Sequence, residues 1–148
     1  MKNITKEDQL REFMGAMGQK TDLPQPSGDL LLFRYELITE EVAELGEELA
    51  ICIAESNFKS GIPDKVKVRV LKELADCIYV LYGLAVTMGL PIDIAFNRVH
   101  KSNMLKLGDD GKPIYREDGK VLKSKNYIPP NLEDLIEEVY YTTSGGVV

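Results

Sequence analysis

Clusters of proline and glycine divide this sequence into long unbroken segments, and they constrain its fold more than any other feature. The breaks fall at TDLPQPSG (21–28), SGIPD (60–64) and GLP (89–91). Between them, apolar residues recur every three or four positions, as in amphipathic helices. The sequence therefore predicts an all-α fold, a helical bundle of three or four main helices followed by a loop-rich C-terminal third.

The helix limits follow from the capping and breaking residues. We expect the first helix from Thr5, as N-cap, to about Gly18, and a long second helix from a cap at Ser27 or Asp29 to about Asn57. Proline at a helix start and glycine after a helix end place the third helix from about Pro63 to Met88 and the fourth from Ile92 to about Leu107.

The C-terminal third has weaker signals. Two Asp-Gly pairs, at 110–111 and 118–119, lie in the segment 108–130 and predict an ordered loop or a hairpin-like excursion. Asn131 is expected to cap a last helix from Leu132 to about Tyr141, with a frayed tail at 142–148. We expect the whole chain, 1–148, to form a single domain.

Charge is unevenly distributed along the chain. The net charge is −6, but residues 98–125 carry 8 basic against 4 acidic side chains, a local +4, which leaves −10 for the remainder. A site with an acidic half and a basic half suits a metal ion with a polyanionic small molecule better than a nucleic-acid groove, where basic charge should dominate. We therefore expect no nucleic-acid partner.

The sequence predicts a cytoplasmic protein without a membrane partner. The first residues lack the apolar core of a signal peptide, and the longest apolar run, 74–90, is short and contains Asp76. The two cysteines, Cys52 and Cys77, lie in apolar helical contexts without a CxxC pair. They are expected to be buried free thiols in a reducing compartment.

The segment TEEVAELGEEL, 39–49, carries five glutamates, which form either a solvated helix face or part of a cleft. On a helical wheel, a core stripe is predicted for Ile38, Val42, Leu45, Leu49 and Ile53. However, Phe33, Leu37 and Ile51 fall within the acidic sector of the same wheel. A face that combines these apolar residues with carboxylates is expected to be partly covered.

A second acidic pair lies in the middle of the third predicted helix. Glu73 and Asp76 are three residues apart and project from one helix face. Asp76 is the only charge in the apolar segment 74–88, which we expect to be buried. Lys72 precedes Asp76 by four residues but is expected on the wetter side. A buried ionised Asp76 would then need a partner or a metal.

These two acidic segments would meet if the two helices pack against one another. At an effective dielectric constant near 20, two carboxylates about 5 Å apart repel by ~3 kcal/mol, so such a cluster requires a divalent cation. Oxygen-only ligands indicate Mg²⁺, with Mn²⁺ as the alternative. A ferritin-like di-iron site needs two histidines in Glu-x-x-His motifs, and the chain has the single histidine His100.

These motifs resemble those of a known superfamily. EExxE (Glu40, Glu41, Glu44), a gap of 28 residues and ExxD (Glu73, Asp76) resemble the signature of the all-α nucleoside triphosphate pyrophosphohydrolases. That superfamily includes MazG, the dimeric dUTPases and phosphoribosyl-ATP pyrophosphohydrolase. RVHKSNMLK (98–106), the DGKxLK segment (118–123) and NYIPP (126–130) further resemble a phosphoribosyl-ATP-pyrophosphohydrolase-like or dimeric-dUTPase-like branch. The resemblance covers roughly residues 5–138.

The resemblance implies a MazG-like bundle that cleaves a (d)NTP between the α and β phosphates, giving (d)NMP and pyrophosphate, in nucleotide-pool house-cleaning. It implies a homodimer or homotetramer. The implied metal ligands are Glu40, Glu44, Glu73 and Asp76, with Glu41 positioning or deprotonating the water. The implied substrate-binding residues are Asn103 and Lys106, three apart on one predicted helix face, and Lys120 and Lys123 from the loop.

Two alternatives stay open at this point. One is phosphoribosyl-ATP hydrolysis in histidine biosynthesis, which is the same chemistry on another substrate. The other is a non-enzymatic helical oligomerisation module with vestigial carboxylates. The long segment 108–130 favours the NTP-cleaving branch, but it does not indicate which base or sugar is preferred.

Overall fold

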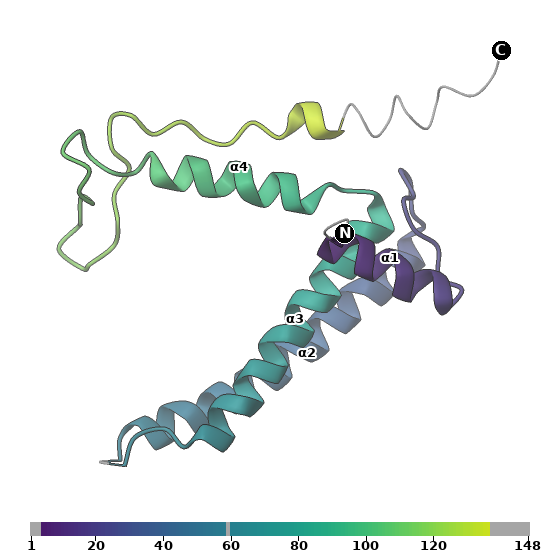
Figure 1. Cartoon of the computed structure of the whole chain (residues 1–148), viewed down its shortest axis with the longest axis horizontal. Helices are drawn as coiled ribbons and strands as arrows, with labels where there is room; N and C mark the ends of the chain where they lie inside the picture. The colour runs from purple at the N-terminus through teal and green to yellow at the C-terminus, as the bar shows by residue number, and fades with distance from the viewer. Residues whose placement is uncertain (1–3, 59, 137–148) are drawn as a thin grey trace. The chain divides into compact units, whose positions relative to one another are not determined.

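The protein is helical in a computed structural model that describes residues 4–58 and 60–136. In this part of the chain the helices are α1 (Lys6–Ala16), α2 (Gly28–Ser56), α3 (Asp64–Met88) and α4 (Ile92–Met104) (Figure 1). The described residues form no strand and only two isolated β-bridges, Leu107 with Pro113 and Tyr115 with Val121. The all-α prediction is confirmed.

The chain forms two compact units, which meet in sequence between Gly89 and Leu90. In the first unit, α2 and α3 lie along one another and α1 packs against α3 (Figure 1). The second unit contains α4 and the segment that follows it. A single domain over residues 1–148 stays a prediction.

The helix ends are determined by local hydrogen bonds. Thr5 and Asp8 form a capping box at the start of α1, with Asp8 N donating to Thr5 Oγ1 at 3.1 Å. Ser27 caps α2, because its Oγ accepts from Leu30 N at 3.3 Å, which decides between the two predicted caps. Gly89 ends α3 in the left-handed conformation, with φ +68°.

The core of the first unit lies where α1 crosses α3. Leu10, Met14 and Val86 are buried together there. The segment after α1 closes over the end of α3, where Asp22 N donates to Val86 O at 2.8 Å. A Cβ on Gly89 would lie 3.3 Å from Asp22 Cα, so both this close approach and the positive φ require glycine.

The predicted core stripe of α2 is wrong in part. Ile38 and Leu45 are half-buried, but Val42, Leu49 and Ile53 are exposed. The helix instead turns toward α3 the face that carries buried or half-buried Arg34, Leu37, Glu41, Leu45 and Glu48. The helical wheel gave the wrong core face because it assumed that the most apolar stripe of α2 packs inside its own chain.

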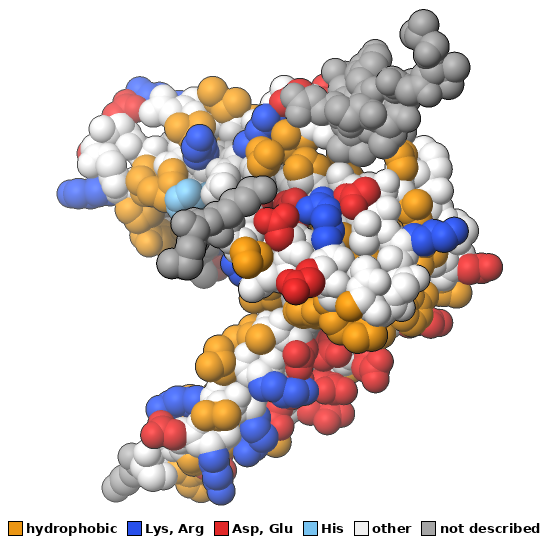
Figure 2. Space-filling view, turned by 45° about the vertical axis from the view of Figure 1, so that its right-hand side comes forward, with side chains coloured by type: hydrophobic (Ala, Val, Ile, Leu, Met, Phe, Trp, Pro, Cys, Tyr) orange, Lys and Arg blue, Asp and Glu red, His pale blue; other side chains and the backbone are white. Residues whose placement is uncertain are grey.

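The prediction that the segment 74–88 is wholly buried is also wrong for the single chain. Leu74, Ile78 and Leu81 are each at least 44% exposed. Together with Leu71 they form a stripe at helical spacing on α3, turned away from the core. Figure 2 shows exposed hydrophobic side chains along the hairpin formed by α2 and α3, beside its acidic side chains.

The second unit departs slightly from the predicted boundaries. Helix α4 ends at Met104, three residues early, because the chain turns there and Leu107 enters the bridge to Pro113. The segment beyond is hairpin-like, as expected. Residues 133–136 are helical, and Asn131 Oδ1 accepts from Glu133 N at 3.1 Å. The rest of the predicted last helix, 137–141, and the tail lie outside the described residues.

Within residues 4–58 and 60–136, no single helix has the length and apolar composition needed to cross a membrane, and α3 and α4 meet those criteria only when taken together.

Candidate functional site

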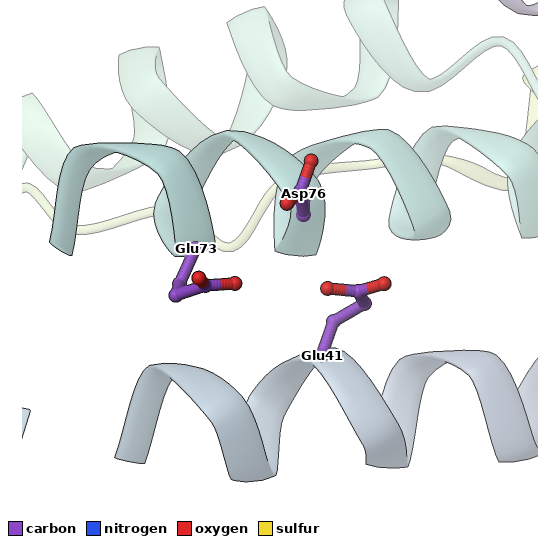
Figure 3. A group of neighbouring side chains, drawn as sticks. All are labelled: Glu41, Glu73 and Asp76. Atoms are coloured by element: carbon purple, nitrogen blue, oxygen red, sulfur yellow. The ribbon is translucent and has the colours of Figure 1, made fainter. Parts of the chain in front are cut away.

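Three carboxylates from two helices converge in the first unit. Glu41 projects from α2, and Glu73 and Asp76 project from one face of α3 (Figure 3). One oxygen from each lies within 4.8 Å of the others. The i,i+3 spacing places Glu73 and Asp76 on one face of α3, and the packing of α2 along α3 brings Glu41 opposite these two residues.

Glu41 is the least satisfied member of this acidic group. It is half-buried, and its Oε2 is buried without a hydrogen-bond partner among the described residues. Burial raises the pKa of Glu41, and the negative charges of Asp76, Glu44 and Glu73 raise it further. A buried carboxylate oxygen without a donor costs free energy unless a proton or cation reaches it.

Lys72 supplies positive charge at the outer side of the group. Its Nζ lies 3.0 Å from Asp76 Oδ2, 3.1 Å from Glu73 Oε2 and 3.8 Å from Glu44 Oε2. The hydrogen bonds to Asp76 and then Glu73 raise the pKa of Lys72. Lys72 is exposed, as expected, but it is not out of reach of Asp76, because the i,i+4 spacing lets its long side chain reach forward along α3.

The acidic group fits a divalent cation. All its donors are carboxylate oxygens, the ligand type that Mg²⁺ and Mn²⁺ prefer. Around one such ion, ligand oxygens at about 2.1 Å lie about 3.0 Å apart when adjacent and about 4.2 Å apart when opposite, so the three oxygens would move together by up to about 2 Å. The partnerless Glu41 Oε2 is the atom that such an ion would satisfy.

The other predicted ligands lie outside the group of three. Glu40 is exposed on α2. Glu44 is also exposed but reaches the same Lys72 that contacts Glu73 and Asp76. A metal role for Glu40 and Glu44 stays a prediction, as do the assigned roles of the three that converge. Glu48, which was not among the predicted ligands, accepts from Arg69 Nε at 2.8 Å.

The predicted phosphate-binding residues all belong to the second unit. Asn103 is exposed on α4, whereas Lys106 lies in the turn beyond it. The prediction that the two share one helix face is therefore wrong. Lys120 and Lys123 are exposed in the hairpin-like segment, and Lys123 Nζ lies 4.5 Å from the centre of the Tyr127 ring. Their role in binding substrate stays a prediction.

Sequence reasoning missed two cations on the α2–α3 hairpin. Lys72 could have been found from its spacing to Asp76. Arg34 is 5% exposed, and its sequence signal was a lone basic residue within the apolar run LLLFRYEL, 30–37. Such a residue on the face that continues to Glu41 indicates a buried polar contact or a binding site.

Comparison with known proteins agrees with the motifs. A family model described as phosphoribosyl-ATP pyrophosphohydrolase matches residues 10–103, a range that includes the whole acidic group. A crystal structure of a candidate NTP pyrophosphohydrolase from Exiguobacterium sp. 255-15 is 25% identical, with 94% of each chain covered and a TM-score of 0.43. Curated proteins gave no significant match.

Proposed function

Because the chain belongs to the phosphoribosyl-ATP pyrophosphohydrolase family, we propose that it hydrolyses a nucleoside triphosphate between the α and β phosphates. The products would be a nucleoside monophosphate and pyrophosphate. The observation that carries the proposal is the convergence of Glu41, Glu73 and Asp76 with one buried oxygen left without a partner. This arrangement destabilises a protein that has no cation or proton to place there.

The carboxylates divide into two roles in this proposal. Glu73 and Asp76 would hold a divalent cation, Mg²⁺ or Mn²⁺, because they share one face of α3, and the buried Oε2 of Glu41 would be the third ligand atom. When bound, the ion supplies positive charge to the phosphates and makes water easier to deprotonate. Glu41 would accept the proton of the attacking water with its other oxygen, since burial and the neighbouring carboxylates raise its pKa and make it a stronger base.

The bond changes are those of an in-line displacement. The water oxygen forms a bond to the α phosphorus, and the bond from that phosphorus to the bridging oxygen breaks. The electron pair of the broken bond leaves with pyrophosphate, and the proton of the water goes to Glu41. The predicted contacts of Asn103, Lys106, Lys120 and Lys123 with the phosphates would offset the charge of the leaving group.

A second copy of the chain is the partner that we propose. Leu71, Leu74, Ile78 and Leu81 follow a three-four-three spacing on α3, and all are exposed. This spacing is typical of a helix seam that packs against other helices. A homodimer or homotetramer would bury the stripe, and the molar mass in solution, measured by light scattering, tests this for wild type and for Ile78→Glu.

Hydrolysis of phosphoribosyl-ATP is a second candidate, and membership of the phosphoribosyl-ATP pyrophosphohydrolase family favours it. A panel of canonical and modified (d)NTPs and phosphoribosyl-ATP, assayed with Mg²⁺ or Mn²⁺ for monophosphate and pyrophosphate, decides between the two. Release of both products from one substrate class supports the enzyme. If no substrate is cleaved and millimolar metal leaves the melting temperature unchanged, the chain is a non-enzymatic helical module instead.

A further inference from the structure

Arg34 is a buried cation on the same hairpin as the acidic group. Its Nε donates to Thr87 Oγ1 at 2.8 Å, and its Nη2 donates to Gln19 Oε1 at 2.8 Å. The Phe33 ring lies 5.5 Å from the guanidinium carbon, within the range of a cation–π contact. Burial lowers the pKa of Arg34. The guanidinium is therefore held in one orientation by neutral groups.

One donor group of Arg34 is left over. Among residues 4–58 and 60–136, no acceptor is found for Nη1 and no carboxylate lies within ion-pair distance of Arg34. Nη1 lies over the bare backbone of Gly83, where an added Cβ would come within 3.6 Å of it. Nη1 keeps some accessible surface, so its donors are open to water or to a ligand.

Arg34 and Gly83, which lie beside one another, both line a cavity of about 290 Å³ between α1, α2 and α3. The rest of the lining is mainly apolar and aromatic, and in it the Phe13 and Tyr79 rings meet edge to face at 5.5 Å. Such a lining, with Arg34 as its one charged group and Gln19 engaged by Arg34 Nη2, suits a flat ring better than a phosphate, which needs several donors. The volume has room for a single base.

The cavity adjoins the acidic group along both helices. Leu37 and Tyr79 line it, and they lie one helical turn from Glu41 and Asp76 respectively. Arg34 is seven residues from Glu41, which at 1.5 Å per residue is about 10 Å along α2. With the phosphates at the acidic group, that distance places Arg34 at the edge of the base farthest from the sugar.

We propose that this cavity binds the base of the substrate and that Arg34 Nη1 donates a hydrogen bond to a carbonyl oxygen on its far edge. The proposal rests on the nucleotide hydrolysis proposed above. A guanidinium has donors only, so it complements O4 of uracil or thymine and O6 of guanine or hypoxanthine. Cytosine and adenine carry amino groups at those positions, and an amino group is a donor that cannot accept a hydrogen bond from Nη1.

Two matched substrate pairs test this specificity. With Mg²⁺, kcat/KM for dUTP should exceed that for dCTP, and kcat/KM for dITP should exceed that for dATP, each by about tenfold or more. In Arg34→Met both ratios should fall to about one, because the donor that distinguishes the bases is lost. Wild-type ratios near one, or unchanged ratios in a folded Arg34→Met, would overturn the proposal.

If Arg34→Met fails to fold, a second variant tests the proposal. Gly83→Ala places a methyl group beside Nη1 at an ordinary contact distance, and alanine is favourable inside a helix. It should lower both ratios by obstructing the acceptor. Gly46→Ala is the matched control, since its added Cβ meets no atom within 4 Å. Unchanged ratios in Gly83→Ala would then contradict the proposal.

Binding of the monophosphates separates this proposal from the proposed hydrolysis. Calorimetric titration with dUMP and dCMP, without metal, should show the same preference and the same loss in Arg34→Met or, if that fails to fold, Gly83→Ala. If no triphosphate is hydrolysed, the proposed function is wrong, but an Arg34-dependent preference for dUMP would still support the cavity as a base site. Equal binding of the two, or no binding of either, would refute it.

Discussion

The α2–α3 hairpin carries opposite charge in two regions, an acidic one near its middle and a basic one near the start of α2. In the acidic region, Glu41, Glu73 and Asp76 crowd together, and Lys72 pairs with Glu73 and Asp76 while one oxygen of Glu41 stays unsatisfied. About 10 Å along the same helix, Arg34 is buried against neutral acceptors. The two charges are therefore not paired with one another, and under the two proposals each region would meet a different part of one ligand.

Removing a charge from the acidic group should have the largest effect on activity. Asp76→Asn keeps the shape of the side chain but weakens it as a ligand, so pyrophosphate release should fall by at least about a hundredfold. Circular dichroism should show unchanged helicity. Glu47→Gln, an exposed change on α2 outside the group, is the control and should keep near wild-type rates. Wild-type rates in Asp76→Asn would refute the site.

Glu41→Gln should separate stability from metal binding. The change removes the ionised group that burial and three like charges disfavour. The melting temperature without metal should therefore rise by about 2–4 °C, the shift expected for ~1 kcal/mol in a domain of this size. Addition of millimolar Mg²⁺ should raise the melting temperature of wild type but not of the variant. A metal-free variant less stable than wild type would contradict this account.

Lys72→Met tests whether the lysine competes with the metal. Lys72 is exposed and contacts the same carboxylates that would bind the cation. Its loss should lower the Mg²⁺ concentration at half-maximal activity by up to about fivefold, the scale of an exposed ion pair. Lys67→Met on the same helix, which removes an exposed pair with Asp64, is the control. An unchanged or higher half-maximal concentration would show that Lys72 assists binding instead.

Acidification should reduce the destabilising effect of Glu41 on the metal-free fold. The folded-state pKa of Glu41 is raised above its ordinary value of 4.5, so the ionised form destabilises the fold. Lowering the pH through that raised pKa toward 4.5 protonates Glu41 and removes this penalty. Without metal, the difference in melting temperature between Glu41→Gln and wild type should shrink by about 2 °C. A difference that grows on acidification would have the wrong sign.

Much of the secondary structure was predictable because it depends on local chemistry. Thr5, Ser27 and Gly89 act where their side chains or backbone freedom suit helix ends, so α1, α2 and α3 begin and end within about two residues of the predicted limits. The end of α4 was less predictable, because the contact of Leu107 with Pro113 competes with the helix.

The site was predictable only where spacing along one helix determines it. Glu73 and Asp76 share a face by their i,i+3 spacing. The cover predicted for the acidic face of α2 is wrong at Phe33 and Ile51, which are exposed, although Glu41 is half-buried. The exposed stripe on α3 could not be distinguished from a core stripe, since both have the same periodicity. The surroundings of Arg34 depend on contacts with α1 and α3 that its own helix does not encode.

Binding of Mn²⁺ is the most direct test of the acidic group. Free Mn²⁺ gives a paramagnetic resonance signal that decreases when the ion binds, so titration reports affinity without any assay of activity. Wild type should remove Mn²⁺ from solution, and Asp76→Asn and Glu41→Gln should remove much less. Equal binding by wild type and both variants, or no binding by wild type, would contradict the claim that these three carboxylates hold a divalent ion.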